Sequence, residues 1–240
     1  MSGDSSHDDV VRREFARQSS TFAQADSFFG LGELGDWIGG ELPLGAQDSV
    51  LDVCGGTADL ALLAANVVGD AGLVTVYDIN RAMMRSGQVK VAARSFSGRV
   101  CFVQGDAERM SFPDDSFDAV MVGFGIRNFV HLEEGLREMH RVLKKGGYFT
   151  ILEFSRPEPA WFRALYHFYS FVIMPLAGQL LAGTRQAYTY LPESIRLFPL
   201  PDELSGILRD IGFTNVTCMR LTKGIAVVHR AEKAHVEDKF

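Results

Sequence analysis

The feature that most constrains the fold is a short apolar run that ends in two glycines and leads into a helical pattern. Residues 50–53 (Val-Leu-Asp-Val) have the composition of a buried strand that is interrupted only by Asp52. Gly55 and Gly56 break that strand, and the apolar residues from Leu60 onward predict a helix. Strand, glycine turn and helix start form the first unit of a nucleotide-binding α/β domain, because the glycines let a ligand approach the backbone and the helix start offers free N–H groups. An ordinary βα turn in any α/β protein has the same pattern.

Strand and helix patterns alternate along the rest of the chain. Four further strands are predicted at residues 73–77, 100–103, 118–122 and 148–154, and helices at residues 81–93, 132–143 and 201–211. Residues 144–147 (Lys-Lys-Gly-Gly) supply a stop for the second of these helices. Residues 214–221 and 225–229 predict a hairpin around Lys223 and Gly224. The predicted fold class is therefore α/β, with a doubly wound, mostly parallel seven-stranded sheet and an antiparallel C-terminal hairpin.

Length and composition limit the classes of function. The 240 residues suit one domain with an elaboration, and a hydrophobic content of 47% is ample for a core. A formal net charge of −6 excludes a footprint for nucleic-acid phosphates. The three cysteines are far apart and lack metal-ligand spacing, so no metal site is expected. With no leader pattern at the N-terminus, the expectation is a cytoplasmic protein with reduced thiols.

The domain is expected to carry two helical additions. Residues 1–9 are polar and acidic and are expected to be a disordered tail, followed by a single domain over residues 10–240. Residues 10–38 mix aromatic and charged side chains at helical spacing and predict a lid of N-terminal helices, although plain packing helices fit equally well. Residues 156–198 form the second addition, a helical insertion after the fifth strand that is expected to cap the substrate.

An acidic residue ends the second predicted strand. Asp78 stands where the second strand of a nucleotide-binding domain places a carboxylate that accepts both ribose hydroxyls. Alternatively, Asp78 caps the helix that begins near Asn80. Its distance from the glycine turn favours the ribose role.

Several separated motifs stand in a recognisable order. They are residues 51–57 (Leu-Asp-Val-Cys-Gly-Gly-Thr), 123–128 (Gly-Phe-Gly-Ile-Arg-Asn), 152–155 (Leu-Glu-Phe-Ser), 188–195 (Tyr-x-Tyr-Leu-Pro-Glu-Ser-Ile) and 221–229 (Leu-Thr-x-Gly-Ile-x-x-x-His). Together they resemble the ubiquinone/menaquinone biosynthesis C-methyltransferase family over about residues 48–233. The resemblance implies a Rossmann-like class I methyltransferase that uses S-adenosylmethionine. It implies C-methylation of a polyprenylated quinol ring, demethylmenaquinol first and the ubiquinone-pathway benzoquinol second.

The resemblance also assigns roles to residues. The cofactor would be held by residues at four strand ends, namely Asp52, Gly55, Gly56, Thr57, Asp78, Ile79, Asp106, Ala107 and Gly123. Among these, Asp78 would bind the ribose, and Asp106 with Ala107 the adenine. Arg127 would face the reacting quinol. Beside it, Asn128 offers an amide for a quinol oxygen or for a helix cap. His167, Tyr188 and Tyr190 are candidates for contacts to the quinol oxygens, with a structural role as the alternative for each. Arginine stays protonated at neutral pH, so Arg127 is assigned electrostatic work, with a salt bridge or helix cap as its structural alternative.

Two positions depart from the family pattern. Ala58 stands where the family has glycine; alanine is tolerated there with a negative φ, but it narrows the approach of the cofactor. Phe22-Ala23 stands where the family carries a Tyr-Asp pair, which removes a hydroxyl and a carboxylate from the expected lid.

Residues 161–183 form an apolar segment that is long enough to span a membrane. His167, Ser170, Gln179 and a central Pro175 argue against a span, and the expectation is helices that line an apolar channel. The alternative is an extra core layer without a ligand. A polyprenyl substrate would account for peripheral contact with a membrane surface. Two other functions remain, a methyltransferase for another phenolic or apolar molecule and a non-catalytic subunit of a quinone-biosynthesis assembly. The oligomeric state, monomer or homodimer, also stays open.

Overall fold

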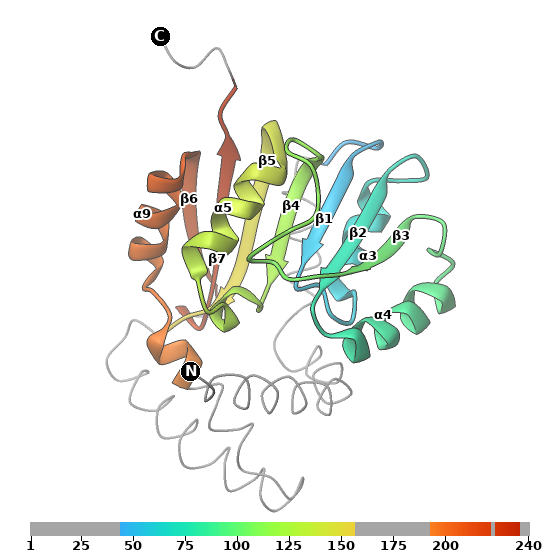
Figure 1. Cartoon of the computed structure of the whole chain (residues 1–240), viewed down its shortest axis with the longest axis horizontal. Helices are drawn as coiled ribbons and strands as arrows, with labels where there is room; N and C mark the ends of the chain where they lie inside the picture. Colours follow the sequence, from blue (N-terminus) through green and yellow to red (C-terminus); the bar gives the residue numbers. More distant parts are fainter. Residues whose placement is uncertain (1–43, 157–192, 222–223, 236–240) are drawn as a thin grey trace, which may run out of the picture.

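Seven strands in the described part of the chain form one twisted sheet (Figure 1). The computed structural model describes residues 44–156, 193–221 and 224–235. The strands are β1 (Ser49–Val53), β2 (Leu73–Asp78), β3 (Val100–Gln104), β4 (Phe117–Gly123), β5 (Leu143–Phe154), β6 (Phe213–Leu221) and β7 (Ala226–Lys233). Their spatial order is β3-β2-β1-β4-β5-β7-β6, with β1 to β5 parallel and β7 antiparallel to both β5 and β6. The predicted fold class is confirmed.

Alternation along the central strands gives the sheet two buried faces. Leu51 and Val53 of β1 pack into one core cluster with side chains of α5 (Leu132–Val142) and α9 (Pro201–Ile211). Val50 packs into a second cluster with α3 (Asp59–Val67) and α4 (Arg81–Ala93). Because successive side chains of a strand point to opposite faces, Asp52 shares the α3 face with Val50.

Local sequence signals explain where the helices begin and end. Asn80 caps α4, because its side chain accepts hydrogen bonds from the backbone N–H groups of Ala82 and Met83. Pro201 occupies the first turn of α9, and Gly212 ends that helix with a φ of 115°. Both helices have the predicted bounds.

The structure differs from the sequence prediction around residues 143–147. Helix α5 ends at Val142 and β5 begins at once with Leu143, which pairs with Phe117. The next pair is Ala119 with Tyr148, so the intervening residues form an irregularity in the strand and not a separate turn. A short 3₁₀ helix, η1 (Ile126–Asn128), was not predicted.

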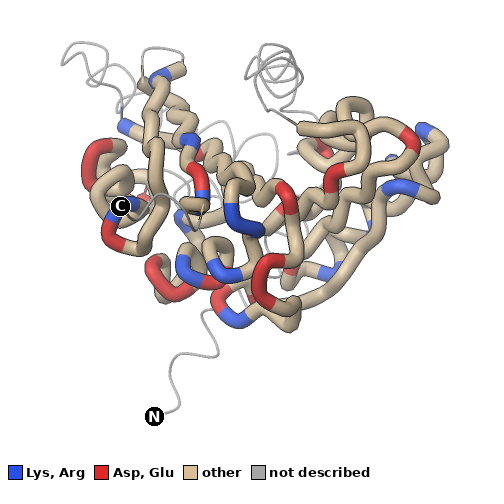
Figure 2. Tube along the Cα trace, turned by 90° about the horizontal axis from the view of Figure 1, so that it is seen from above, with Lys and Arg blue, Asp and Glu red and all other residues tan. Residues whose placement is uncertain are grey.

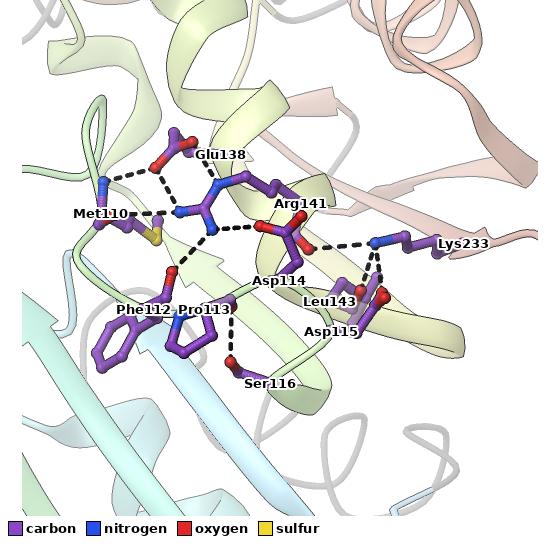
Figure 3. Close-up of polar contacts among 10 residues, drawn as sticks. All are labelled: Met110, Phe112, Pro113, Asp114, Asp115, Ser116, Glu138, Arg141, Leu143 and Lys233. Carbon is purple, nitrogen blue, oxygen red and sulfur yellow. Dashed lines mark hydrogen bonds and ion pairs between the residues drawn. The ribbon is translucent and has the colours of Figure 1, made fainter.

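The connection between β3 and β4 is fastened to α5 by Arg141 (Figure 3). The Arg141 guanidinium donates to Glu138 and Asp114 and to the carbonyl oxygens of Met110 and Phe112. Glu138 in turn accepts the Met110 N–H at 2.7 Å. These contacts fix a connection that starts beside Asp106. Lys233 also forms an ion pair with Asp115 at 2.7 Å. Along the described trace, cationic and anionic residues are interleaved (Figure 2).

Several predictions concern residues outside the described ranges and stay predictions. They are the tail at 1–9, the lid at 10–38 with Phe22-Ala23, the apolar segment at 161–183, and His167, Tyr188 and Tyr190.

Candidate active site

The turn between β1 and α3 lies at the carboxyl edge of the sheet. Gly56 adopts a φ of 43°, and a Cβ atom there would lie 2.7 Å from Cε of Met83. Its N–H donates to Oδ2 of Asp78 at 2.9 Å. Gly56 is therefore required for both the backbone conformation and the close approach of α4.

Ala58 in the same turn does not have the negative φ under which alanine would be tolerated there without strain. It adopts a left-handed conformation with a φ of 65°, although it carries a Cβ atom. The Ala58 N–H donates to the Gly55 carbonyl at 2.6 Å, which closes the turn. Since Ala58 is fully buried against the α3 face, packing and this hydrogen bond hold it in a conformation that alanine disfavours.

Asp52 is a fully buried carboxylate beside the turn. Its Oδ2 accepts the Ala61 N–H at 3.1 Å, whereas Oδ1 has no hydrogen-bond partner among the described residues. Burial raises the pKa of Asp52 well above its usual range, and the negative charges of Asp78 and Asp59 add to the rise. A cationic ligand group near Oδ1 would relieve this cost, so Asp52 fits the ammonium group at the amino-acid end of S-adenosylmethionine.

The hydroxyl of Thr57 is engaged within the protein. It donates to Asp59, whose carboxylate binds Lys90 of α4 at 2.7 Å. In this arrangement Thr57 ties the turn to α4, and the Thr57 hydroxyl is not free for a ligand while the bond to Asp59 is made.

Asp78 ends β2, and its carboxylate holds two backbone N–H groups. Oδ2 accepts from Gly56 as described, and Oδ1 accepts from Asn80 at 2.6 Å. Burial raises the pKa of Asp78, and these two hydrogen bonds oppose the rise. Because Asn80 caps α4, the helix-cap alternative for Asp78 does not hold. Each carboxylate oxygen can accept a further hydrogen bond, as a ribose with two hydroxyls would require. The neighbouring Ile79 is 39% exposed and offers an apolar surface.

The end of β3 lies next to the end of β2. Gly105 donates its N–H to the Asp78 carbonyl at 3.1 Å, and the Tyr77 hydroxyl donates to the Asp106 carbonyl at 3.3 Å. Asp106 is exposed and Ala107 is buried, so a carboxylate and an apolar wall follow one another at this edge. These are the residue types expected beside an adenine ring.

The end of β4 carries Gly123 and the η1 turn. A Cβ atom at Gly123 would lie 2.5 Å from Cδ1 of Leu60, so glycine permits the close approach of α3. Asn128 donates its backbone N–H to the Gly125 carbonyl at 3.1 Å, within η1.

Arg127 and Glu153 form a buried ion pair at the same edge. Nη1 of Arg127 lies 2.7 Å from Oε1 of Glu153, and both side chains are 2% exposed. The salt bridge proposed as the structural alternative for Arg127 therefore exists. It does not use the whole guanidinium, because Nε has no hydrogen-bond partner among the described residues.

The Cys54 thiol lies close enough to both Asp52 and Asp78 and to the Arg127–Glu153 ion pair to be influenced by their charges. Burial raises the pKa of the Cys54 thiol, as do Asp78, Asp52 and Glu153, while Arg127 opposes the rise. These four charged residues thus surround the β1–α3 turn. The sequence motifs at residues 51–57 and 152–155 contain Cys54 and Glu153, but neither residue was assigned a role. The available signal for Glu153 was a carboxylate inside the apolar run of β5.

Known proteins with the same sequence pattern are methyltransferases. A model of the ubiE/COQ5 methyltransferase family matches residues 40–233. The chain is 45% identical to the ubiquinone/menaquinone biosynthesis C-methyltransferase UbiE of Pseudomonas putida (strain W619), over 77% of this chain and 72% of that protein.

Solved structures share the fold. A SAM-dependent methyltransferase from Aquifex aeolicus matches 90% of this chain and 97% of that chain, with a TM-score of 0.64 and 19% identity. The [4+2]-cyclase SpnF matches 84% of this chain and 81% of that chain, with a TM-score of 0.65 and 20% identity. Because one neighbour is a cyclase, the fold by itself does not determine the reaction.

Proposed function

The chain belongs to the ubiE/COQ5 methyltransferase family, and on this premise we propose that it methylates a ring carbon of a polyprenylated quinol. It is a C-methyltransferase that depends on S-adenosylmethionine. The proposed substrate is demethylmenaquinol, with the ubiquinone-pathway benzoquinol as the second candidate. The observation that supports a quinol substrate is a buried arginine, Arg127, whose Nε has no hydrogen-bond partner among the described residues.

We propose that three strand ends hold the cofactor. Asp52 would neutralise the ammonium group of its amino-acid end, Asp78 would accept the ribose hydroxyls, and Asp106 with Ala107 would flank the adenine. Two of the carboxylates have a raised pKa caused by burial, and a cation or hydroxyl donors placed beside them would lower that cost. S-adenosylmethionine, when bound, supplies a methyl group on a sulfonium sulfur.

Methylation of a quinol ring carbon depends more on stabilisation of negative charge than on a strong general base. A quinol carbon becomes nucleophilic as a phenolic proton leaves to water, and negative charge then develops on the ring oxygen. Arg127 stays protonated and would stabilise that charge, while the buried surroundings exclude bulk water. Most of the acceleration is assigned to positioning and desolvation.

An in-vitro assay with both prenylated quinols and product masses tests this function. A mass gain of one methyl group on a ring carbon supports it, and the faster quinol identifies the substrate. Methylation of only an unrelated phenol would favour the second candidate activity. A protein that fails to bind S-adenosylmethionine in calorimetric titration would be the non-catalytic subunit.

Arg127→Ala is expected to lower kcat by about 10²–10³-fold while the Kd of S-adenosylmethionine stays unchanged. Arg127→Lys should recover only part of the rate, because an ammonium lacks the planar fork. If Arg127 only supports the fold, both variants would show a lower Tm with normal turnover in the folded fraction.

We also propose that residues 161–183 bind the prenyl tail and that the enzyme works in the cytoplasm at a membrane surface. Within the described ranges, no helix is both long and apolar enough to cross a bilayer. Each buried CH₂ group contributes about 0.8 kcal/mol, so KM should fall as the prenyl tail lengthens. Equal turnover of a tail-free quinol would contradict the tail site, and flotation with lipid vesicles tests the membrane contact.

A further inference from the structure

Glu153 is a buried carboxylate at the active-site edge of the sheet. It lies one residue before the end of β5 and is 2% exposed. Oε1 accepts from Nη1 of Arg127 at 2.7 Å and from the Phe154 N–H at 2.8 Å, and Oε2 accepts the Arg127 N–H at 3.2 Å. The Glu153 carboxylate therefore accepts three hydrogen bonds, two of them from Arg127.

These contacts occupy one end of the Arg127 guanidinium. Nη1 donates both to Glu153 and to the Phe124 carbonyl. None of the hydrogen bonds of Arg127 to described residues uses Nε or Nη2, and Nε is buried. The N–H groups of Nε and Nη2 lie along one edge of the planar guanidinium and point in the same direction, as a bidentate donor pair.

Aromatic rings fix the plane of the guanidinium. Cζ of Arg127 lies 5.4 Å from the centroid of the Phe154 ring. That ring stacks on Phe124, with centroids 4.3 Å apart and an interplanar angle of 30°. The same two residues also supply a backbone acceptor to Arg127 and a backbone donor to Glu153. Arg127 is thus held at its backbone, at Nη1 and across its face.

We propose that Glu153 is a positioning residue that holds Arg127 by Nη1 and thereby keeps the Nε–Nη2 edge available for the oxygen of the reacting quinol. This inference rests on the proposed function, because it concerns the charge that develops on a quinol oxygen. Glu153 acts through Arg127 and does not touch the substrate. Without Glu153, the Arg127 guanidinium would have more possible orientations, and few of them direct two N–H groups at one oxygen atom. The ion pair therefore favours the productive orientation.

The test separates position from charge with two variants of Glu153. Glu153→Asp keeps the charge but withdraws the carboxylate by one CH₂ group, and Glu153→Gln keeps the length but removes the charge. Since a misplacement of about 1 Å can cost on the order of 10²-fold in rate, kcat on the prenylated quinol should fall about 10²-fold in both. The Kd of S-adenosylmethionine, measured by calorimetry, should stay within about twofold, because the hydrogen bonds of Glu153 go to Arg127 and Phe154, neither of which is a proposed cofactor contact.

A double-mutant cycle decides whether Glu153 acts through Arg127. Arg127→Met combined with Glu153→Gln removes both buried charges, so this variant should fold even where a single one does not. Its kcat should equal that of Arg127→Met alone, because a positioning residue has nothing left to position. Asp118→Asn is the matched control. Asp118 lies at the start of β4 and forms an ion pair with Lys144, so this variant also removes one carboxylate of an ion pair but should leave kcat unchanged.

Three outcomes would overturn the inference. Normal kcat in Glu153→Asp, with an active wild-type enzyme, shows that position does not matter and leaves the proposed function intact. A double variant whose rate loss is the product of the two single losses shows that Glu153 acts independently of Arg127. A wild-type enzyme that methylates no quinol overturns the proposed function and this inference together.

Discussion

Asp78→Asn tests the ribose assignment and the turn geometry in one protein. The carboxylate accepts the Gly56 N–H at 2.9 Å and the Asn80 N–H at 2.6 Å. An amide has a single acceptor oxygen, so in either orientation one backbone N–H faces an NH₂ group. A hydrogen bond to a charged acceptor contributes about 1.5–3 kcal/mol, and part of its loss is offset because the variant no longer buries a charge.

The expected loss in the free energy of unfolding is therefore about 1 kcal/mol, which corresponds to a Tm roughly 2–4 °C lower in a protein of this size. The loss for the cofactor is larger, because a ribose hydroxyl loses a charged acceptor with no compensation. At about 1.5–3 kcal/mol this weakens S-adenosylmethionine binding roughly 10- to 150-fold.

Calorimetric titration and thermal unfolding on the same preparation measure both effects. Asp70→Asn is the control, because the Asp70 side chain is fully exposed and only pairs with Arg99 at 3.4 Å. A lower Tm with an unchanged Kd would mean that Asp78 supports the turn and does not bind the ribose. An unchanged Tm and Kd would refute the reasoning for both roles.

Three further predictions follow from individual residues. Burial lowers the pKa of His229, whose Nδ1 has no partner among the described residues, so the unfolded chain takes up this proton first and His229 lowers the free energy of unfolding as pH falls below about 6.5. In urea unfolding, the free energy of unfolding should therefore fall less between pH 7.5 and pH 5.5 in His229→Gln than in wild type. Ala58→Gly should change the free energy of unfolding, measured by urea denaturation, by less than about 1 kcal/mol, because relief of the left-handed backbone (about 1–2 kcal/mol) is offset by the loss of a buried methyl group and by a more flexible unfolded chain. Ala58→Val should lower the free energy of unfolding by more than about 2 kcal/mol in the same assay, because a β-branched side chain fits neither the left-handed backbone nor the buried site. Arg141→Ala should release the β3–β4 connection shown in Figure 3 and raise the Kd of S-adenosylmethionine severalfold in calorimetry without changing kcat; an unchanged Kd would show that this connection does not position the adenine residues.

The parts of the fold that follow local rules could be predicted from the sequence. Helix α4 was placed correctly because Asn80 is a strong N-cap and the apolar residues of the helix keep a helical period. Helix α9 was placed correctly because Pro201 and Gly212 mark its two ends. The hairpin and the parallel order followed from turn residues and from short connections.

Features that depend on tertiary contacts could not be predicted. The left-handed φ of Ala58 opposes the local preference of alanine, and only the closed turn and the buried α3 face impose it. The partner of Arg127 is also non-local, because Glu153 is 26 residues away and reaches Arg127 through the pairing of β4 with β5. The sequence indicated a charge in an apolar strand but not the charge that would compensate it.

Three of the six non-glycine residues with a positive φ in the described ranges lie at the site. Cys54, Ala58 and Phe124 all carry a positive φ without being glycine, and each such residue costs about 1–2 kcal/mol. At Phe124, two hydrogen bonds offset the cost of the left-handed backbone. The Phe124 N–H donates to the Leu152 carbonyl at 2.8 Å, and the Phe124 carbonyl accepts from Arg127. The β4–β5 pairing and the ion pair thus hold Phe124 from both sides.

This strain also links the two halves of the site. A Cβ atom at Gly125 would lie 2.4 Å from Cβ of Cys54, so the strand end that carries Arg127 packs directly on the glycine turn. The same Arg127 nitrogen that binds Glu153 also donates to the Phe124 carbonyl, so a change at Glu153 should also weaken the hold on Phe124. We therefore expect changes at Glu153 to affect the Arg127 guanidinium first, because Glu153 contacts it directly, and the glycine turn second, because Gly125 packs on Cys54.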